Sequence, residues 1–131
     1  MTTITPRPDE IVTTYLTAFF GGDIATARGL VHDDFRFVAP LDSGGIDEFF
    51  AGAERKAALI RNLRIQRLWS DADEVATVYE LEIETATGSA SLQVFEWDRV
   101  RDGRVVATTM LFDTADRAVE LMRDALTAAA L

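Results

Sequence analysis

Residues 75–112 decide the fold of this chain, and they read VATVYELEIETATGSASLQVFEWDRVRDGRVVATTMLF. Apolar and polar residues alternate over most of this stretch, which is the two-residue period of a half-buried β-strand. Turn-forming residues interrupt the alternation at Thr87-Gly88 and at Arg101-Asp102-Gly103. Because such short connections join antiparallel neighbours, the stretch predicts three hairpin-linked strands at about 75–85, 89–100 and 104–112.

The flanking sequence completes an α+β pattern. A fourth strand-like run, at about 63–69, comes just before the turn at 70–73. Upstream, apolar residues recur at helical spacing, and downstream the chain is rich in alanine. The expected elements outside the meander are helices at 9–20, 23–31, 46–61 and 114–131 and a short strand at 35–39. Helices first and a meander afterwards predict one α+β domain over residues 1–131.

Composition excludes several classes of function. The chain has 131 residues, 48% of them hydrophobic, and a formal net charge of −9. A negative surface repels phosphate backbones and anionic lipids, so we expect neither nucleic acid nor membrane as a partner. There is no Cys, and His32 is the only histidine, so we expect no metal site and no cofactor. We see no export signal and expect a cytoplasmic protein.

Local motifs give a family resemblance. The segments are Tyr15–Asp23, Asp33–Pro40, and Asp102–Val106 leading to Leu111–Asp113. In this order, over about residues 9–113, the chain resembles the SnoaL-like (NTF2-like) superfamily. The resemblance implies a cone-shaped fold in which N-terminal helices pack on a curved antiparallel sheet around a cavity, with residues 114–131 as an extra C-terminal helix. It also implies a homodimer.

Strand alternation, matched to the ketosteroid-isomerase-like members of that superfamily, predicts which side chains face the cavity. On the last hairpin the match turns the odd-numbered residues 93–97 and the even-numbered residues 108–112 inward. The predicted ligand pocket consists of Phe19, Phe37, Ala39, Tyr79, Gln93, Phe95, Trp97, Met110 and Phe112. The carboxylates Glu80, Glu82 and Glu84 are then expected on the opposite face, exposed to solvent or to a second copy.

The catalytic candidates are Tyr15 and His32. Tyr15 matches the tyrosine with which ketosteroid isomerases stabilise an oxyanion. The position of their base is Ala39 here, and the position of their protonated acid is Phe95. We therefore predict no isomerisation of Δ5-3-ketosteroids, unless a bulge in the sheet turns Glu96 inward. His32 is the other candidate, either as a general base beside Asp33 and Asp34 or simply as an exposed turn residue.

Three functions remain open from the sequence. The first is a domain whose apolar pocket binds a small hydrophobic or aromatic molecule, with no assignable mechanism. The second is an acid–base enzyme of the isomerase, polyketide cyclase or hydratase/hydrolase type that acts on a hydrophobic substrate. The third is a non-catalytic dimeric scaffold whose pocket is merely core.

Overall fold

The protein was analysed as a computed structural model, which describes residues 6–129. Five helices and six strands make up this part of the chain. In order they are α1 (Pro8–Phe20), α2 (Ile24–Gly29), β1 (Val31–Val38), β2 (Ser43–Gly44), α3 (Ile46–Phe50), α4 (Ala53–Ala57), β3 (Ile60–Asp71), β4 (Glu74–Thr85), β5 (Gly88–Arg101), β6 (Arg104–Leu111) and α5 (Arg117–Ala129).

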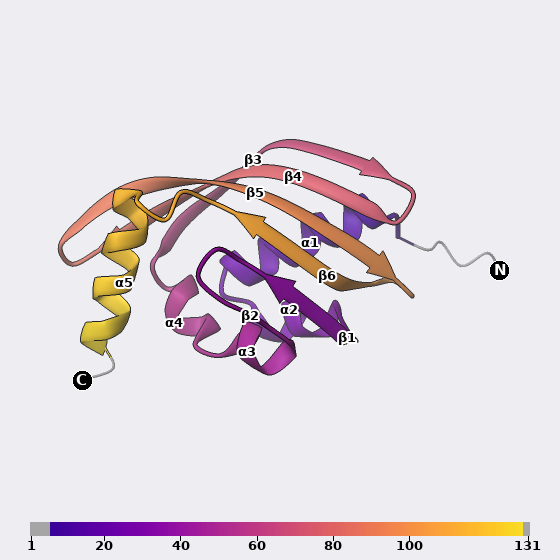
Figure 1. The fold of residues 1–131 in the computed structure, drawn as a ribbon, viewed down its shortest axis with the longest axis horizontal. Coiled ribbons are helices and arrows are strands. Elements are labelled where there is room, and N and C mark those ends of the chain that lie inside the picture. The colour runs from indigo at the N-terminus through magenta and orange to yellow at the C-terminus, as the bar shows by residue number, and fades with distance from the viewer. Residues whose placement is uncertain (1–5, 130–131) are drawn as a thin grey trace.

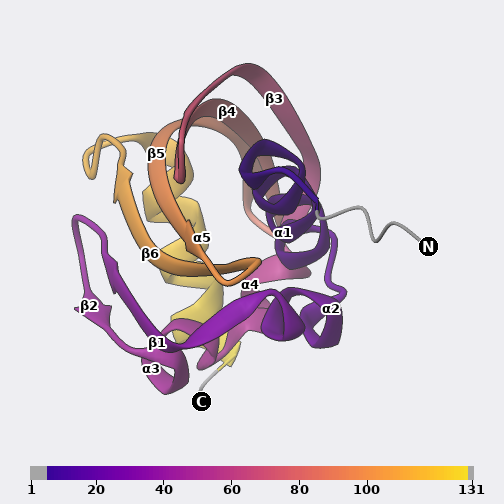
Figure 2. The same cartoon turned by 90° about the vertical axis from the view of Figure 1, so that its right-hand side faces the viewer.

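The six strands form one curved sheet in the order β2-β1-β6-β5-β4-β3. Strands β3 to β6 are the expected antiparallel meander. The pair β1–β6 is parallel, a departure from the all-antiparallel expectation, since these strands are far apart in the chain and no hairpin fixes their direction. In Figures 1 and 2 the sheet curls over α1 on one side, and α5 closes one end. The result is the predicted α+β cone with an additional C-terminal helix.

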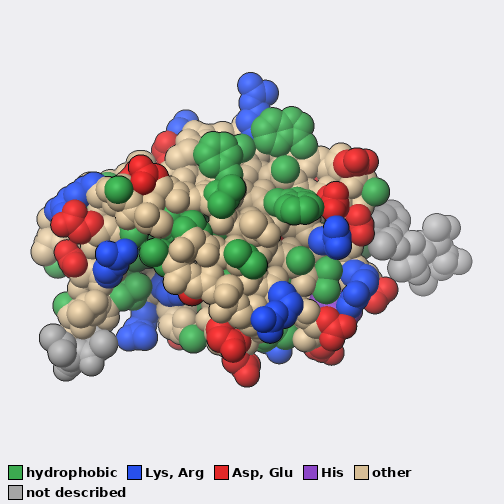
Figure 3. Space-filling view, in the orientation of Figure 1, with side chains coloured by type: hydrophobic (Ala, Val, Ile, Leu, Met, Phe, Trp, Pro, Cys, Tyr) green, Lys and Arg blue, Asp and Glu red, His purple; other side chains and the backbone are tan. Residues whose placement is uncertain are grey.

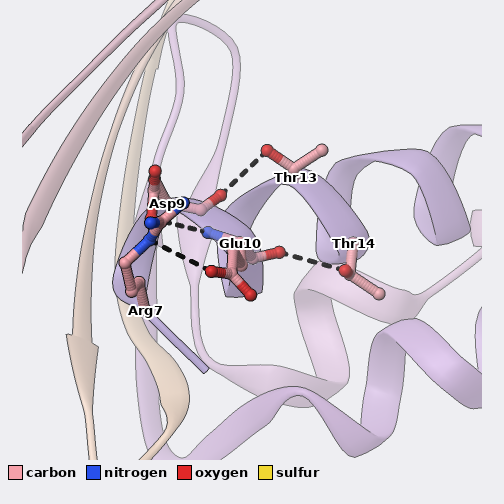
Figure 4. A network of polar contacts seen from close by, with 5 residues as sticks. All are labelled: Arg7, Asp9, Glu10, Thr13 and Thr14. Atoms are coloured by element: carbon pink, nitrogen blue, oxygen red, sulfur yellow. Dashed lines mark hydrogen bonds and ion pairs between the residues drawn. The ribbon is translucent and has the colours of Figure 1, made fainter. Parts of the chain in front are cut away.

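Helix α1 begins one turn before its first apolar residue. Its N-cap is Arg7, which makes no capping hydrogen bond through its side chain. Arg7 Nε instead lies 3.2 Å from Asp9 Oδ1 and 3.0 Å from Glu10 Oε1 (Figure 4). The hydroxyls of Thr13 and Thr14 donate to the carbonyls of Asp9 and Glu10. The carboxylates in the first turn also stabilise the helix, because they lie near the positive end of its dipole.

An aromatic cluster fills the space between α1, α3 and β1. The ring of Phe49 lies 5.0 Å, centroid to centroid, from each of Phe19, Phe35 and Phe37. Tyr15 stacks on Phe49 at 6.3 Å. Offset and edge-on contacts at these separations stabilise a core beyond the area that they bury. The helical periodicity of α1 thus places its apolar face where the sequence predicts.

Several boundaries differ from the predictions. The helix expected at 23–31 ends at Gly29, and the strand expected at 35–39 begins at Val31. The helix expected at 46–61 is two short helices, because Gly52 between them has a φ of +69°, and its last residues belong to β3. The helix expected at 114–131 begins at Arg117, and residues 130–131 lie outside the described residues. Among the described helices, none combines the length and the apolar character needed to cross a membrane.

Candidate functional site

The concave face of the sheet and the helices enclose an apolar cavity of about 350 Å³. It runs between β1, β4, β5 and β6, with α1, α3, α4 and α5 as the other walls. Most of the lining is aliphatic or aromatic. The polar or charged side chains along it are Asp42, Lys56, Tyr79 and Arg123. Such a lining suits a small, mostly apolar molecule that a few polar groups orient.

Tyr79 connects this cavity to a buried polar cluster. The tyrosine is fully buried on β4, and its hydroxyl donates to Glu96 Oε1 at 2.7 Å. Glu96 and Asp98 lie two residues apart on β5, so their side chains point to the same face of the strand, and they are only 3% and 1% exposed. We call these two residues the acid pair. It lies behind Tyr79 and is not itself part of the cavity lining.

A second chain of hydrogen bonds reaches the acid pair from α1. The Thr108 hydroxyl donates to Asp98 Oδ1 at 2.5 Å. Since that bond uses its only proton, the 3.4 Å contact with Tyr15 has the Tyr15 hydroxyl as donor. Tyr15 is therefore a buried member of the network and does not line the cavity.

The acid pair is protonated more readily than ordinary carboxyl groups. Burial raises the pKa of Glu96, and burial together with the charge of Glu96 raises the pKa of Asp98 well above its usual range. Burial and the nearby carboxylates likewise raise the pKa of Tyr15 and of Tyr79 well above the usual value. Both tyrosines are thus proton donors at neutral pH.

Among the described residues, two oxygens of the acid pair lack a hydrogen-bond donor. Thr108 and Tyr79 each donate to one carboxyl of the acid pair, and within residues 6–129 the remaining oxygens, Glu96 Oε2 and Asp98 Oδ2, have no hydrogen-bond donor. A single proton held between the two carboxyl groups satisfies this arrangement and avoids burying two negative charges side by side. Two carboxyl groups that share a proton are a recurrent acid–base device.

Six of the nine predicted pocket residues line the cavity. They are Phe19, Phe37, Ala39, Tyr79, Met110 and Phe112. The prediction was wrong for Phe95 and Trp97, which are 53% and 50% exposed on the convex face. It was also wrong for Gln93, whose amide nitrogen bonds to Gln66 Oε1 and to the Tyr79 carbonyl on that same face.

A β-bulge explains why the prediction assigned the wrong residues of β5 to the inward face. An unbroken hairpin through Asp102-Gly103 pairs Trp97 with Thr108 and turns both inward. In the structure the register shifts at Val106, so that Asp98 pairs with Thr108 and Glu96 with Met110. One extra residue on one strand exchanges the faces of its partner strand. Glu96 is therefore turned inward, the condition under which the sequence left ketosteroid isomerisation open.

The bulge also changes the catalytic candidates. Phe95 is exposed and Glu96 is buried, so the prediction that an apolar residue takes the inward place of an acid on this strand is wrong. His32 is a half-buried residue of β1, outside the cavity lining, and its Nδ1 accepts from the backbone N–H of Asp34 at 3.0 Å. In residues 6–129 no three His, Asp or Glu side chains gather as they would around a metal ion.

The comparisons with known proteins concern family and fold. The family model described as a SnoaL-like domain matches residues 12–108. A solved protein from Kribbella flavida DSM 17836 is 23% identical, with a TM-score of 0.76 over 92% of this chain and 96% of that one. An NTF2-like protein of unknown function from Cytophaga hutchinsonii ATCC 33406 is 14% identical, with a TM-score of 0.71 over 87% of this chain and 96% of that one.

An LEH-like epoxide hydrolase from M. tuberculosis is 19% identical, with a TM-score of 0.73 over 94% of each chain. Similarities at this level of identity establish the fold, and they confirm the NTF2-like α+β cone. No curated protein matches the chain.

Proposed function

This chain belongs to the family of SnoaL-like domains, and we propose that it is an acid–base enzyme whose cavity holds a small, largely apolar molecule. The observation that carries the proposal is the contact between Tyr79 and Glu96. Tyr79 has the only hydroxyl group among the described residues that line the cavity, and a carboxyl group of the buried acid pair lies directly behind it.

In the proposed mechanism Tyr79 acts on an oxygen atom of the bound molecule. When the proton of the acid pair leaves the position between the two carboxyl groups and lies on Glu96 Oε1, which faces Tyr79, the tyrosine accepts a hydrogen bond from Glu96 and turns its own proton into the cavity. Charge that develops on the ligand oxygen is then stabilised by a preorganised donor in an apolar surrounding, a contribution of roughly 3–4 kcal/mol for one such donor. The acid pair supplies or takes up the proton as needed.

The cost of the acid pair supports a chemical role. Burying carboxyl groups beside each other destabilises a fold relative to apolar side chains of similar volume. A domain that used its cavity only as core would gain from replacing them. One solved relative is named an LEH-like epoxide hydrolase, which fits acid–base chemistry on this scaffold.

Binding is tested first with a neutral apolar fluorophore, N-phenyl-1-naphthylamine. We expect saturable binding that Ala39→Phe abolishes, because Ala39 lines the cavity. Ala51→Phe is the matched control, since Ala51 is exposed and outside the lining. Equal binding by both variants would contradict the assignment of the ligand to this cavity.

Turnover is tested with 2-tetralone and styrene oxide, which report α-proton exchange and epoxide opening by NMR. We expect at least one reaction above the buffer rate, with loss of about 10²-fold or more in Tyr79→Phe and Glu96→Gln. Glu82→Gln, an exposed change on β4, should leave the rate unchanged. Fluorophore binding without either reaction would contradict the catalytic half of the proposal and favour a binding protein.

A further inference from the structure

We propose that the molecule bound in this cavity is an apolar acid, whose carboxylate is held at the cavity rim by Lys56 and Arg123. This inference rests on the proposed ligand-binding role of the cavity and adds the chemical class of the ligand. We define the cavity rim as the three charged residues of the lining, Asp42, Lys56 and Arg123.

The two rim cations come from separate helices. Lys56 is half-buried near the end of α4, and Arg123 is exposed in the middle of α5. The sequence contains no other lysine. The chain carries 22 acidic against 13 basic residues, so two cations beside one apolar cavity run against its overall charge.

Neither rim cation is paired within residues 6–129. The described ion pairs occupy other basic residues, namely Arg7, Arg61, Arg64, Arg99, Arg101 and Arg117. Asp42 is the one acid of the rim, and its backbone carbonyl accepts from the Ala39 N–H at 2.8 Å. Its charge leaves the rim with a net charge of +1, which matches one carboxylate.

Charged rim residues beside an apolar lining favour the binding of an amphipathic acid. The cavity lining combines the partly exposed rim residues with Tyr79, which is fully buried. An apolar body can leave water along the lining while the carboxylate stays near solvent, so it keeps hydration and gains charge-assisted hydrogen bonds.

The experiment compares two probes of the same shape, 1-naphthaleneacetic acid and 1-naphthaleneacetamide, by calorimetry at neutral pH. We expect the acid to bind about tenfold or more tightly than the amide, because hydrogen bonds to a charged group are the stronger ones. High salt should weaken binding of the acid and leave the amide unaffected.

The variants Lys56→Gln and Arg123→Gln, together, should abolish the preference without changing amide affinity. Arg55→Gln and Arg117→Gln are the matched controls on the same two helices, since neither residue lines the cavity. Equal affinities of the native protein for acid and amide, or a preference that persists in the double variant, would overturn the inference alone. Failure of both probes to bind would contradict the cavity's proposed role and this inference with it.

Discussion

At residues 95–98 the two faces of β5 reverse the usual distribution of side chains. On the concave face, Glu96 and Asp98 are buried in the core, whereas on the convex face Phe95 and Trp97 are half exposed. A strand optimised only for stability would present the aromatics inward and the carboxylates to water. This reversal indicates that the side chains on both faces of the strand have a role other than stabilising one isolated chain.

The convex face carries an apolar patch that extends beyond β5. Trp69 lies on β3 and Leu111 ends β6, and both are more than half exposed. Phe95 pairs with Leu111, while Trp69 and Trp97 flank Ala76 across adjacent strands. We call Trp69, Phe95, Trp97 and Leu111 the outer patch; Figure 3 shows large hydrophobic side chains gathered over this part of the sheet.

The largest effect is expected from removing one member of the acid pair. Asp98→Ala leaves Thr108 and Glu96 without their buried partner and should lower the free energy of unfolding by about 3 kcal/mol. Chemical denaturation measures it. The double variant Glu96→Met with Asp98→Leu should recover most of that loss, because an apolar pair needs no proton. A double variant less stable than Asp98→Ala would show that the acid pair stabilises the fold.

The pH dependence of the free energy of unfolding gives a second test of the cost of burying the acid pair. The pKa values of Glu96 and Asp98 are raised in the folded state. The contribution of these two groups to the free energy of unfolding is therefore fully present below about pH 4, and it is lost as the pH rises through their folded-state pKa values. The unfolding free energy of the native protein minus that of Glu96→Gln/Asp98→Asn should therefore fall with rising pH, by at most about 1.4 kcal/mol per pH unit for each proton. A difference that stays flat would contradict the raised values.

The outer patch predicts association of two copies. We expect a twofold homodimer at micromolar concentration, measured by light scattering, in which Phe95 and Trp97 of each chain are covered. The carboxylate row of β4 does not oppose this strongly, since Arg64 and Arg61 already neutralise two of its members. Phe95→Ser with Trp97→Ser should give a monomer without loss of fold. Leu41→Ser, an equally exposed change outside the patch, should leave the dimer intact.

The smallest effect is expected at the charged border of the outer patch. Arg99 Nη2 lies 2.8 Å from Glu74 Oε1, with both side chains well exposed. Water and salt screen such a pair, so Arg99→Ala should leave the denaturation midpoint of the monomeric double variant unchanged. A clear loss of stability there would show that convex-face charges matter as much as the concave-face acid pair.

Sequence periodicity alone determined the class and order of the elements. The four strands of the meander and the apolar face of α1 follow from local patterns of period two or 3.6, which depend on short-range geometry. Which residues of β4 and β6 face inward was predicted by matching these patterns to the ketosteroid-isomerase-like members, and six of the predicted residues line the cavity. The break at Gly52 and the parallel pairing of β1 with β6 could not be predicted, because neither is set by local periodicity.

Only the tertiary structure decided which face of β5 is buried, and with it the candidate chemistry. The hairpin at Thr87-Gly88 pairs Thr77 with Glu96, which turns Glu96 inward, whereas counting back from Asp102-Gly103 without a bulge turns Trp97 inward. The two counts disagree by one residue, and the bulge at Val106 resolves the disagreement. A single unpaired residue leaves hydrophobic periodicity almost unchanged but exchanges the two faces of the neighbouring strand. The family resemblance, together with strand alternation, therefore predicted an apolar pocket, while the acid pair behind Tyr79 emerged only from how the strands are paired.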